Sequence, residues 1–235
     1  MTIRKLILEL KKEKDLSRAQ NESRYFKTKK GEYGEGDIFW GVPTDQKRKL
    51  AKKYRNLPLK EMKKLLTSPV HDQRFIALVI LTTKYSKADQ KEKEKIFKFY
   101  LKHTKYINNW DLVDISAPRI IGAHLLDKNR SLLFKLAKSK NLWERRISII
   151  ATFSFIKEDQ LKDTLEISKI LLVDEHDLIH KAAGWALREV GKKDLTALES
   201  FLDKHALNMP RTMLRYSIEK MSEKKRQYYL NLGNK

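Results

Sequence analysis

The sequence predicts an all-α protein built from repeated helix pairs. Along most of the chain, apolar residues recur at the three- and four-residue spacing of an amphipathic helix. Continuous alternation of β-branched and polar residues, which is typical of strands, is absent. A polar residue just before an apolar run recurs at intervals of 40, 32 and 35 residues, at Arg74, Asp114, Arg146 and Lys181.

The N-terminal part of the chain predicts two helices followed by a loop. An apolar stripe with lysines opposite predicts a helix over residues 2–14, and a second helix is expected over residues 16–26. Residues 27–37 hold three of the eight glycines of the protein, and the beginning of this segment is strongly basic. Glycines at this density predict a loop.

The remaining chain predicts one helix after another. Thr44 is expected to cap a basic helix that ends near Arg55, and Pro58 to begin a helix that ends near Ser68. Further helices are expected over residues 71–84, 88–103, 109–126, 130–139, 141–155, 159–172, 176–190, 194–205 and 210–219. A short basic tail is expected after Met221, and residues 1–235 are expected to form a single domain.

The repeat interval indicates how these helices are arranged. Intervals of 32 to 40 residues are typical of helix-pair repeats of the HEAT or armadillo kind, which stack into a curved solenoid. Equivalent positions in such repeats line one surface, usually the concave one. The four polar positions are therefore expected to form a stripe that faces a ligand, although helical bundles produce similar loose repeats.

Composition favours a polyanionic partner. Lys and Arg outnumber Asp and Glu by 51 to 30, which gives a net charge of +21. Such a charge attracts nucleic acid or an anionic membrane when it is concentrated on one face. No apolar run approaches the roughly 18 residues of a membrane-spanning helix. The N-terminus lacks a small-residue cleavage site, and the absence of cysteine excludes disulfides, thiolate metal sites and thiol nucleophiles. A soluble intracellular protein is therefore expected.

Asp114 is the candidate catalytic residue. It follows Trp110 by four residues, so the indole and the carboxylate share one face of the expected helix. Val113, Ile115 and Ala117 are apolar, and a carboxylate among such neighbours is partly desolvated and electrostatically strong. The alternative is a carboxylate that lies on the helix surface or caps the helix. Asp111 is expected to face water or to cap the helix start.

Trp110, Trp143 and Trp185 each lie beside a charged residue where an apolar stripe meets the expected concave surface. Indoles in such positions could pack on a deoxyribose or stack with a base, and a cationic base would gain cation–π attraction. The alternative is that these tryptophans belong to the hydrophobic core. Trp40 is expected to pack the loop against the first helices.

Clustered cations are expected to contact phosphate groups. Arg74, Arg146 and Lys181 are expected to do so from repeat positions. The remaining candidates are Lys27, Lys29, Lys30, Arg48, Arg211 and Arg215. Solvated basic helix faces are the alternative. His176 and His180 lack the third ligand of a zinc site, and no nucleotide-binding or nucleophile motif occurs. Neither a metal nor a cofactor is therefore expected.

Three of these segments resemble a known family. NWDLVDISAP at residues 109–118, NLWERR at 141–146 and HKAAGWALREVG at 180–191, with Arg24-Tyr25-Phe26, resemble the bacterial AlkD family of HEAT-like-repeat alkylpurine DNA glycosylases. The resemblance covers nearly the whole chain. The segment 27–41 departs from the family pattern, because it is longer and rich in glycine.

The resemblance implies both a fold and an activity. The implied fold is a right-handed α-solenoid of HEAT-like repeats with DNA in its basic concave groove. The implied activity is hydrolysis of the N-glycosidic bond of cationic N3- and N7-alkylated purines in duplex DNA, without rotation of the lesion into a pocket. The catalytic aspartate falls on Asp114, the sugar-packing tryptophans on Trp110 and Trp185, the arginine on Arg146 and an aromatic contact on Tyr25. A monomeric protein of the bacterial cytoplasm, associated with the nucleoid, is expected.

Two other readings remain open. A non-catalytic helical-repeat protein that binds distorted or branched DNA would share every feature except turnover. A scaffold for other proteins is the commonest role of helical repeats, but the net charge of +21 and the aromatic–charge pairs disfavour it.

Overall fold

The computed structural model describes residues 2–232. Over this range the regular secondary structure is helical, and the β-structure is limited to an isolated bridge between Ile38 and Val70. The all-α class predicted from the sequence is confirmed. The chain divides into two compact units, residues 1–120 and 121–235. The single domain, the handedness of the solenoid and its concave groove stay predictions.

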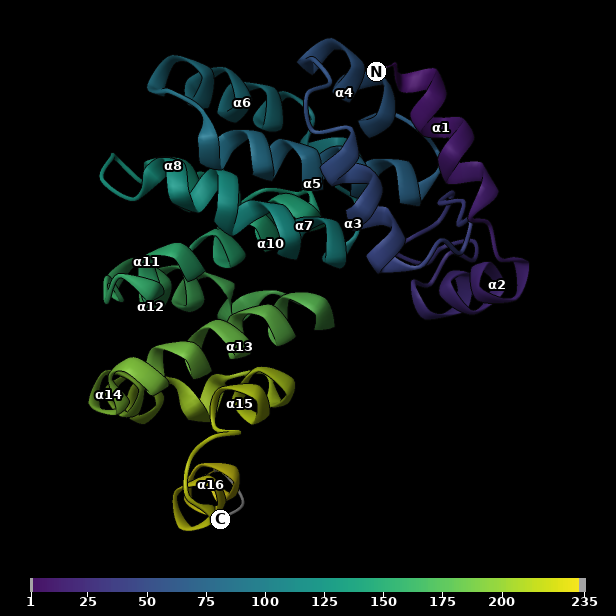
Figure 1. Cartoon of the computed structure of the whole chain (residues 1–235). Coiled ribbons are helices and arrows are strands. Elements are labelled where there is room, and N and C mark those ends of the chain that lie inside the picture. The colour runs from purple at the N-terminus through teal and green to yellow at the C-terminus, as the bar shows by residue number, and fades with distance from the viewer. Residues whose placement is uncertain (1, 233–235) are drawn as a thin grey trace. The chain divides into compact units, whose positions relative to one another are not determined.

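The first unit is built around helix α5, His71–Lys87. The other helices of this unit are α1 (Ile3–Lys12), α2 (Leu16–Tyr25), α3 (Thr44–Lys53), α4 (Leu59–Leu66), α6 (Gln90–Lys102) and α7 (Trp110–Ala117) (Figure 1). Every residue of α5 from His71 to Leu78 is buried, and α3, α4 and α7 pack against this helix. Thr44 is the first residue of α3 and makes no side-chain cap, contrary to expectation, because Pro43 occupies the capping position.

Two buried carboxylates of the first unit anchor the predicted loop, which is confirmed between α2 and α3. Asp37 pairs with Arg74 at 2.6 Å and accepts a hydrogen bond from the Asn108 side chain at 3.0 Å. Asp72 accepts hydrogen bonds from the backbone N–H groups of Trp40 and Val42 at 2.8 and 3.3 Å. Because the returning half of the loop is bonded to α5, its path is fixed relative to the core.

The second unit is built around helix α13, Asp177–Lys193. The other helices are α8 (Ala123–Leu125), α9 (Ser131–Ala137), α10 (Leu142–Ala151), α11 (Phe153–Lys157), α12 (Lys162–Ile170), α14 (Leu195–His205), α15 (Arg211–Ser217) and α16 (Glu223–Asn231). Small residues on α13 let α15 approach closely (Figure 1). A Cβ added at Gly184 would lie 2.5 Å from the carbonyl oxygen of Met213, so this contact requires glycine.

Two expected helices are interrupted. The helix expected over residues 109–126 ends at Ala117 and continues as a π-helical turn, Pro118–Gly122, before α8. Pro118 has no amide hydrogen to donate to the carbonyl of Asp114, which explains why the regular helix ends there. The helix expected over residues 141–155 divides at Thr152, whose hydroxyl donates to the carbonyl of Ile149 at 2.7 Å.

The segment after Met221, expected as a short basic tail without a helix, forms helix α16 over residues 223–231. Tyr229 is buried, and its hydroxyl donates to Asp203 of α14 at 2.9 Å. Arg211 of α15 donates to the backbone carbonyl of Leu230 at 2.9 Å. The helix is therefore held by a few tertiary contacts, which its weakly amphipathic sequence did not reveal.

Candidate active site and nucleic-acid interface

Helix α7 presents Trp110 and Asp114 on one face of the first unit. Asn109 is fully buried, and its side-chain oxygen accepts a hydrogen bond from the backbone N–H of Trp110 at 2.8 Å, so the helix begins at the tryptophan. One turn later comes Asp114, and both residues are half-buried. Burial raises the pKa of Tyr100 and the charge of Asp114 raises it further, whereas a hydrogen bond with Ser116 opposes the shift. Trp110 and Asp114 thus share one side of α7, and the catalytic role of Asp114 stays a prediction.

Asp111 shares the half-buried side of α7. Its carboxylate accepts a hydrogen bond from the backbone N–H of Leu112 at 2.8 Å, but the capping position itself belongs to Asn109. The same carboxylate lies 3.0 Å from Nε2 of His71, a fully buried residue of α5. The start of α7 is therefore tied to the core helix next to Trp110, a contact that the sequence did not reveal.

Aromatic rings surround Trp110. Tyr25, the last residue of α2, is 65% exposed and meets the indole edge-on, with ring centroids 5.9 Å apart. Phe26 stacks on the indole with a centroid distance of 5.3 Å and an interplanar angle of 25°. The structure thus brings Tyr25, a predicted contact residue, to Trp110, although more than 80 residues separate them in the chain. An exposed ring, an indole and a carboxylate lie together within the first unit.

The second unit holds Trp185, on α13. This residue is half-buried, its Nε1 donates to Glu189 at 3.2 Å, and the ring of Phe153 lies 4.5 Å away at 62°. Phe153 was not among the residues expected from the sequence, because nothing in its spacing distinguishes it from a core residue. Trp143 is 7% exposed and belongs to the core, as the alternative reading has it.

The cations in repeat register differ in their surroundings. Arg74 is 3% exposed, pairs with Asp37 and donates to the Ser68 carbonyl at 2.8 Å. Arg146 is 5% exposed and donates to the carbonyl of Leu178 at 2.7 Å, which joins α10 to α13. A phosphate contact by Arg74 would require its side chain to leave a buried ion pair. Lys181 is more open and pairs with Asp177 at 2.7 Å.

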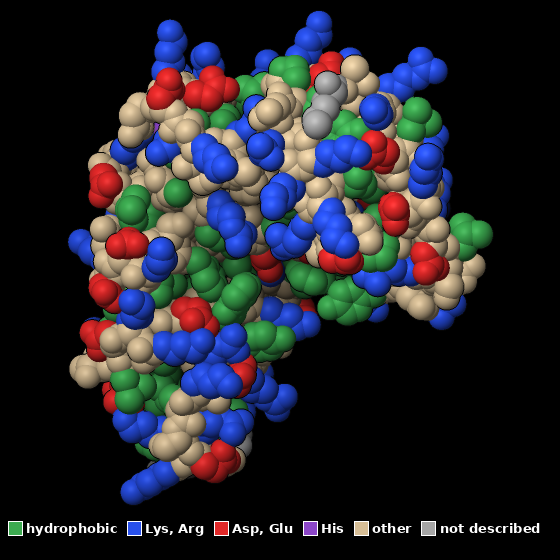
Figure 2. Space-filling model, viewed as in Figure 1, with side chains coloured by type: hydrophobic (Ala, Val, Ile, Leu, Met, Phe, Trp, Pro, Cys, Tyr) green, Lys and Arg blue, Asp and Glu red, His purple; other side chains and the backbone are tan. Residues whose placement is uncertain are grey.

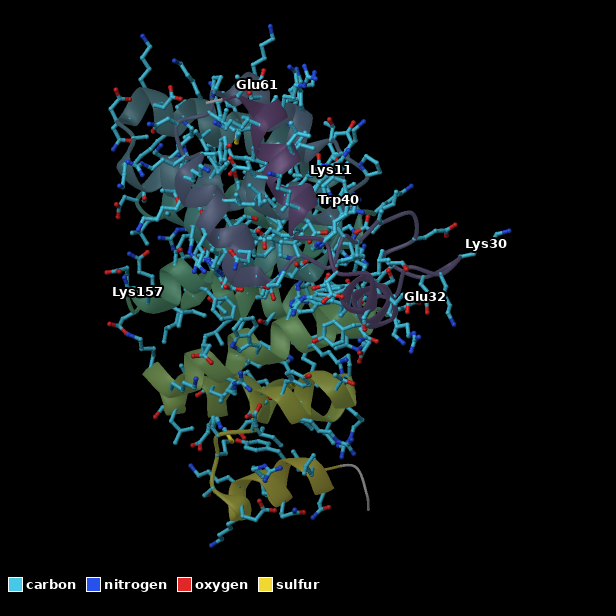
Figure 3. All side chains as sticks on the ribbon, turned by 45° about the vertical axis from the view of Figure 1, so that its right-hand side comes forward. Lys11, Lys30, Glu32, Trp40, Glu61 and Lys157 are labelled. Carbon is cyan, nitrogen blue, oxygen red and sulfur yellow. The ribbon has the colours of Figure 1, made fainter. Side chains whose placement is uncertain are left out.

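The other predicted phosphate contacts are exposed residues. Those in the first unit are Lys27, Lys29, Lys30 and Arg48, and those in the second unit are Arg211 and Arg215. Figure 3 shows Lys30 at the apex of the loop after α2, pointing away from the helices. On the face seen in Figure 2, basic side chains gather over α3, which carries Arg48. Lys47 of the same helix is instead buried, 3.4 Å from Asp72, and takes part in anchoring the loop.

The loop exit packs as expected. The side chain of Lys14 lies over the Trp40 ring, with its nitrogen 4.1 Å from the centroid, and Lys11 lies 5.8 Å away (Figure 3). Trp40 therefore joins the loop to the end of α1. No helix within residues 2–232 is long and apolar enough to cross a membrane. Over the same residues, no group of three His, Asp or Glu side chains is placed to hold a metal ion.

Comparisons with known proteins concern almost the whole chain. A family model described as DNA alkylation repair enzyme matches residues 6–221. A solved structure described as a predicted DNA alkylation repair enzyme from Enterococcus faecalis shares the fold, with a TM-score of 0.69 and 15% sequence identity. The match covers 90% of this chain and 98% of that one. None of the curated proteins matches the chain significantly.

Proposed function

The chain belongs to the DNA alkylation repair enzyme family, and on that premise we propose that it is a monofunctional DNA glycosylase. Its substrates are N3- and N7-alkylated purines in duplex DNA, whose N-glycosidic bond it hydrolyses. The observation that carries the proposal is the geometry of α7, where a half-buried carboxylate, Asp114, lies one turn from an indole that other aromatic rings support.

The chemistry of the substrate explains why one carboxylate suffices. Alkylation at N3 or N7 gives the purine a positive charge, so the base is a good leaving group that needs no general acid. Bond cleavage leaves an oxocarbenium-like sugar, which a partly desolvated carboxylate stabilises electrostatically. In the proposed complex, Asp114 also orients the water that attacks C1′. We assign packing against the deoxyribose to Trp110, and the resemblance of residues 180–191 to the family suggests the same role for Trp185.

Selectivity follows from the same argument. A charged base leaves its sugar far more readily than an unmodified one, so the enzyme can act on the lesion without rotating it out of the duplex. Phosphate contacts then need only hold the DNA, and we assign this role to the exposed cations, with Tyr25 as an aromatic contact. Arg146 would act through its connection to α13, which carries Trp185.

Replacement of Asp114 by Asn tests the proposal. We expect the rate of 7-methylguanine release from methylated duplex DNA to fall by about 100-fold or more, because the variant cannot offset positive charge on the sugar. Duplex affinity should stay similar or rise, since a negative charge near phosphate is lost. Asp127→Asn, which changes an exposed aspartate of the second unit in the same way, is the matched control. Full activity of Asp114→Asn would end the assignment of this residue.

One alternative has an observation in its favour. The basic loop of residues 27–41 is firmly anchored yet exposes Lys27, Lys29 and Lys30, an arrangement suited to holding distorted or branched DNA without turnover. The base-release assay separates the two functions. Binding to branched DNA with no released purine would favour the non-catalytic function.

A further inference from the structure

Five aromatic side chains of the first unit form one cluster, which we call the aromatic cluster: Tyr25, Phe26, Phe39, His71 and Trp110. Phe26 stacks on Phe39 with a centroid distance of 5.0 Å and an interplanar angle of 10°. The His71 ring lies 4.5 Å from Phe39 and 5.3 Å from Phe26. Phe26 is also in contact with Tyr25 at 5.1 Å and with Trp110 at 5.3 Å, so it contacts every other member of the cluster.

The cluster is fixed at its inner end and open at its outer end. Phe39 is 7% exposed and His71 is fully buried, so these rings belong to the core around α5. Trp110 is half-buried and Tyr25 is 65% exposed. Phe26 lies between the two pairs and follows directly after α2. The orientation of the indole is therefore connected to the core through the Phe26 ring.

The backbone on both sides of Trp110 is fixed separately. Asn108 donates to Asp37 of the loop at 3.0 Å, and Asp111 lies 3.0 Å from Nε2 of His71. These contacts determine where the tryptophan backbone lies, but the side-chain torsions of an indole remain free unless a neighbouring ring holds them. Stacked aromatic rings prefer parallel, offset arrangements, which restricts those torsions.

We propose that Phe26 is a positioning residue that holds the indole of Trp110 in the orientation used against the sugar. The proposal rests on the proposed glycosylase function, in which Trp110 forms one wall of the site. Phe26 acts only through Trp110 and contacts no reacting atom. Since a displacement of about 1 Å in a site can cost 100-fold in rate, loss of the supporting ring should be measurable in turnover.

The experiment measures the mobility of the indole and the rate of base release in parallel. The protein has four tryptophans, so 15N labelling gives four indole N–H signals, and Trp110→Phe identifies the signal of residue 110. In Phe26→Leu we expect the order parameter of this signal to fall clearly below its wild-type value, because the indole becomes mobile on the ps–ns timescale. The single-turnover rate of 7-methylguanine release should fall about tenfold, with duplex affinity unchanged.

Two further variants separate positioning from general damage. Phe26→Tyr keeps the ring and should retain both the order parameter and the rate. Phe99→Leu makes the same substitution in another aromatic pair of the first unit, where the Phe99 ring lies 4.3 Å from His103, and should change neither measurement. If Phe26→Leu does not fold, Phe39→Leu removes the ring behind Phe26 and should lower the order parameter of Trp110 by a smaller amount.

The outcomes are distinct. An unchanged order parameter in Phe26→Leu, or a changed one with an unchanged rate, would overturn the proposal. A reduced rate with a rigid indole would also overturn it, because Phe26 would then act by another route. If the wild-type protein releases no base, the proposed function fails, while the order parameter still decides whether Phe26 holds Trp110.

Discussion

His176 caps helix α13 with a ring nitrogen, because its Nδ1 accepts a hydrogen bond from the backbone N–H of Leu178 at 3.1 Å. Only the unprotonated nitrogen can accept this bond. Burial lowers the pKa of His176, and Arg145 and His180 lower it further, whereas Asp174 and Asp177 oppose the shift. The folded second unit therefore favours the neutral imidazole at the beginning of the helix that carries Trp185.

The lowered pKa predicts a pH dependence of stability. Below the ordinary histidine pKa of about 6.5, the unfolded chain binds a proton at His176 more readily than the folded chain does. The contribution of neutral His176 to the free energy of unfolding is therefore fully present above that pH and is lost as the pH falls through the lower pKa of the folded state. His176→Asn retains a capping side chain that does not titrate. Urea unfolding at pH 8 and at about pH 5 should therefore show a larger loss for the wild type than for His176→Asn. Parallel losses would contradict the prediction, since all other titrating groups are common to both proteins.

Single residues show where sequence reasoning works and where it ends. The shared face of Trp110 and Asp114 was predictable, because a four-residue spacing on a helix places two side chains on one face whatever the tertiary structure. Phe26, Phe39 and His71 come from three separate segments, and only folding brings their rings together. These contacts leave no local pattern, so no spacing rule could have identified them.

The cations in repeat register illustrate the same limit. Arg74 and Lys181 occupy equivalent positions in the repeat, but Arg74 is buried against Asp37 and Lys181 lies half-open beside Asp177. The difference arises because the loop before α3 supplies the carboxylate of Asp37 to Arg74, whereas Lys181 pairs with Asp177 of its own helix. Removing one partner of a buried pair costs about 3–5 kcal/mol, so Arg74 contributes to folding whatever it does toward DNA.

At the scale of helices, the contact between α13 and α15 depends on Gly184. A Cβ at this position would lie 2.5 Å from the carbonyl oxygen of Met213 and 2.6 Å from Cβ of Tyr216. Neither atom is the flexible end of a side chain, so α15 would have to move. The segment that contains Gly184 also contains Trp185, and its glycine is thus explained by helix packing.

Gly184→Ala should lower the free energy of unfolding by about 1–3 kcal/mol, despite the better helix propensity of alanine. Urea denaturation measures the change. Gly191→Ala, on the same helix, is the matched control, because the closest atom there is the terminal Cδ2 of Leu198, which can rotate away. Equal effects of the two substitutions would show that helix propensity, and not the close approach of α15, governs the cost.

Helix boundaries show which elements the sequence could predict. The apolar pattern located the central helices α5 and α13 correctly. Helix α13 buries one stripe, whereas α5 is buried on every side from His71 to Leu78. Apolar periodicity did not predict the π-helical turn after Ala117 or the division at Thr152, because the periodicity continues across both. Helix α16 was not predicted because its sequence lacks an apolar stripe. Buried Tyr229 and a few polar contacts hold this helix in place.

At the scale of the whole molecule, the net charge of +21 governs encounter with DNA. Many acidic residues are neutralised locally by neighbouring lysines and arginines, as in the surface pairs Lys98–Glu94 and Lys64–Glu61. The lysines and arginines that exceed the acidic residues in number remain available to attract phosphate groups. Composition therefore favours a polyanionic partner, but the positions of any contacts depend on the fold.

Salt dependence tests the predicted contacts of the loop apex. Each phosphate neutralised by a cation contributes roughly 0.9 to the slope of log K against log salt, so Lys29→Gln with Lys30→Gln should reduce the slope by about 2. Lys91→Gln with Lys102→Gln removes the same charge from exposed positions of α6 and should leave the slope nearly unchanged. A reduction of equal size in both double variants would indicate an effect of net charge, without direct contact by the loop.

The anchoring of the loop by Asp37 and Asp72 has a consequence for how this protein can diverge. Both carboxylates bind the returning half of the loop to α5, beyond the apex that contains Gly31 and Gly36, where an added side chain would meet open space. Insertions or deletions at the apex would leave Phe39 and its neighbours in place. Natural variation can therefore alter how far this segment extends while the packing around Phe39 and Trp110 stays unchanged.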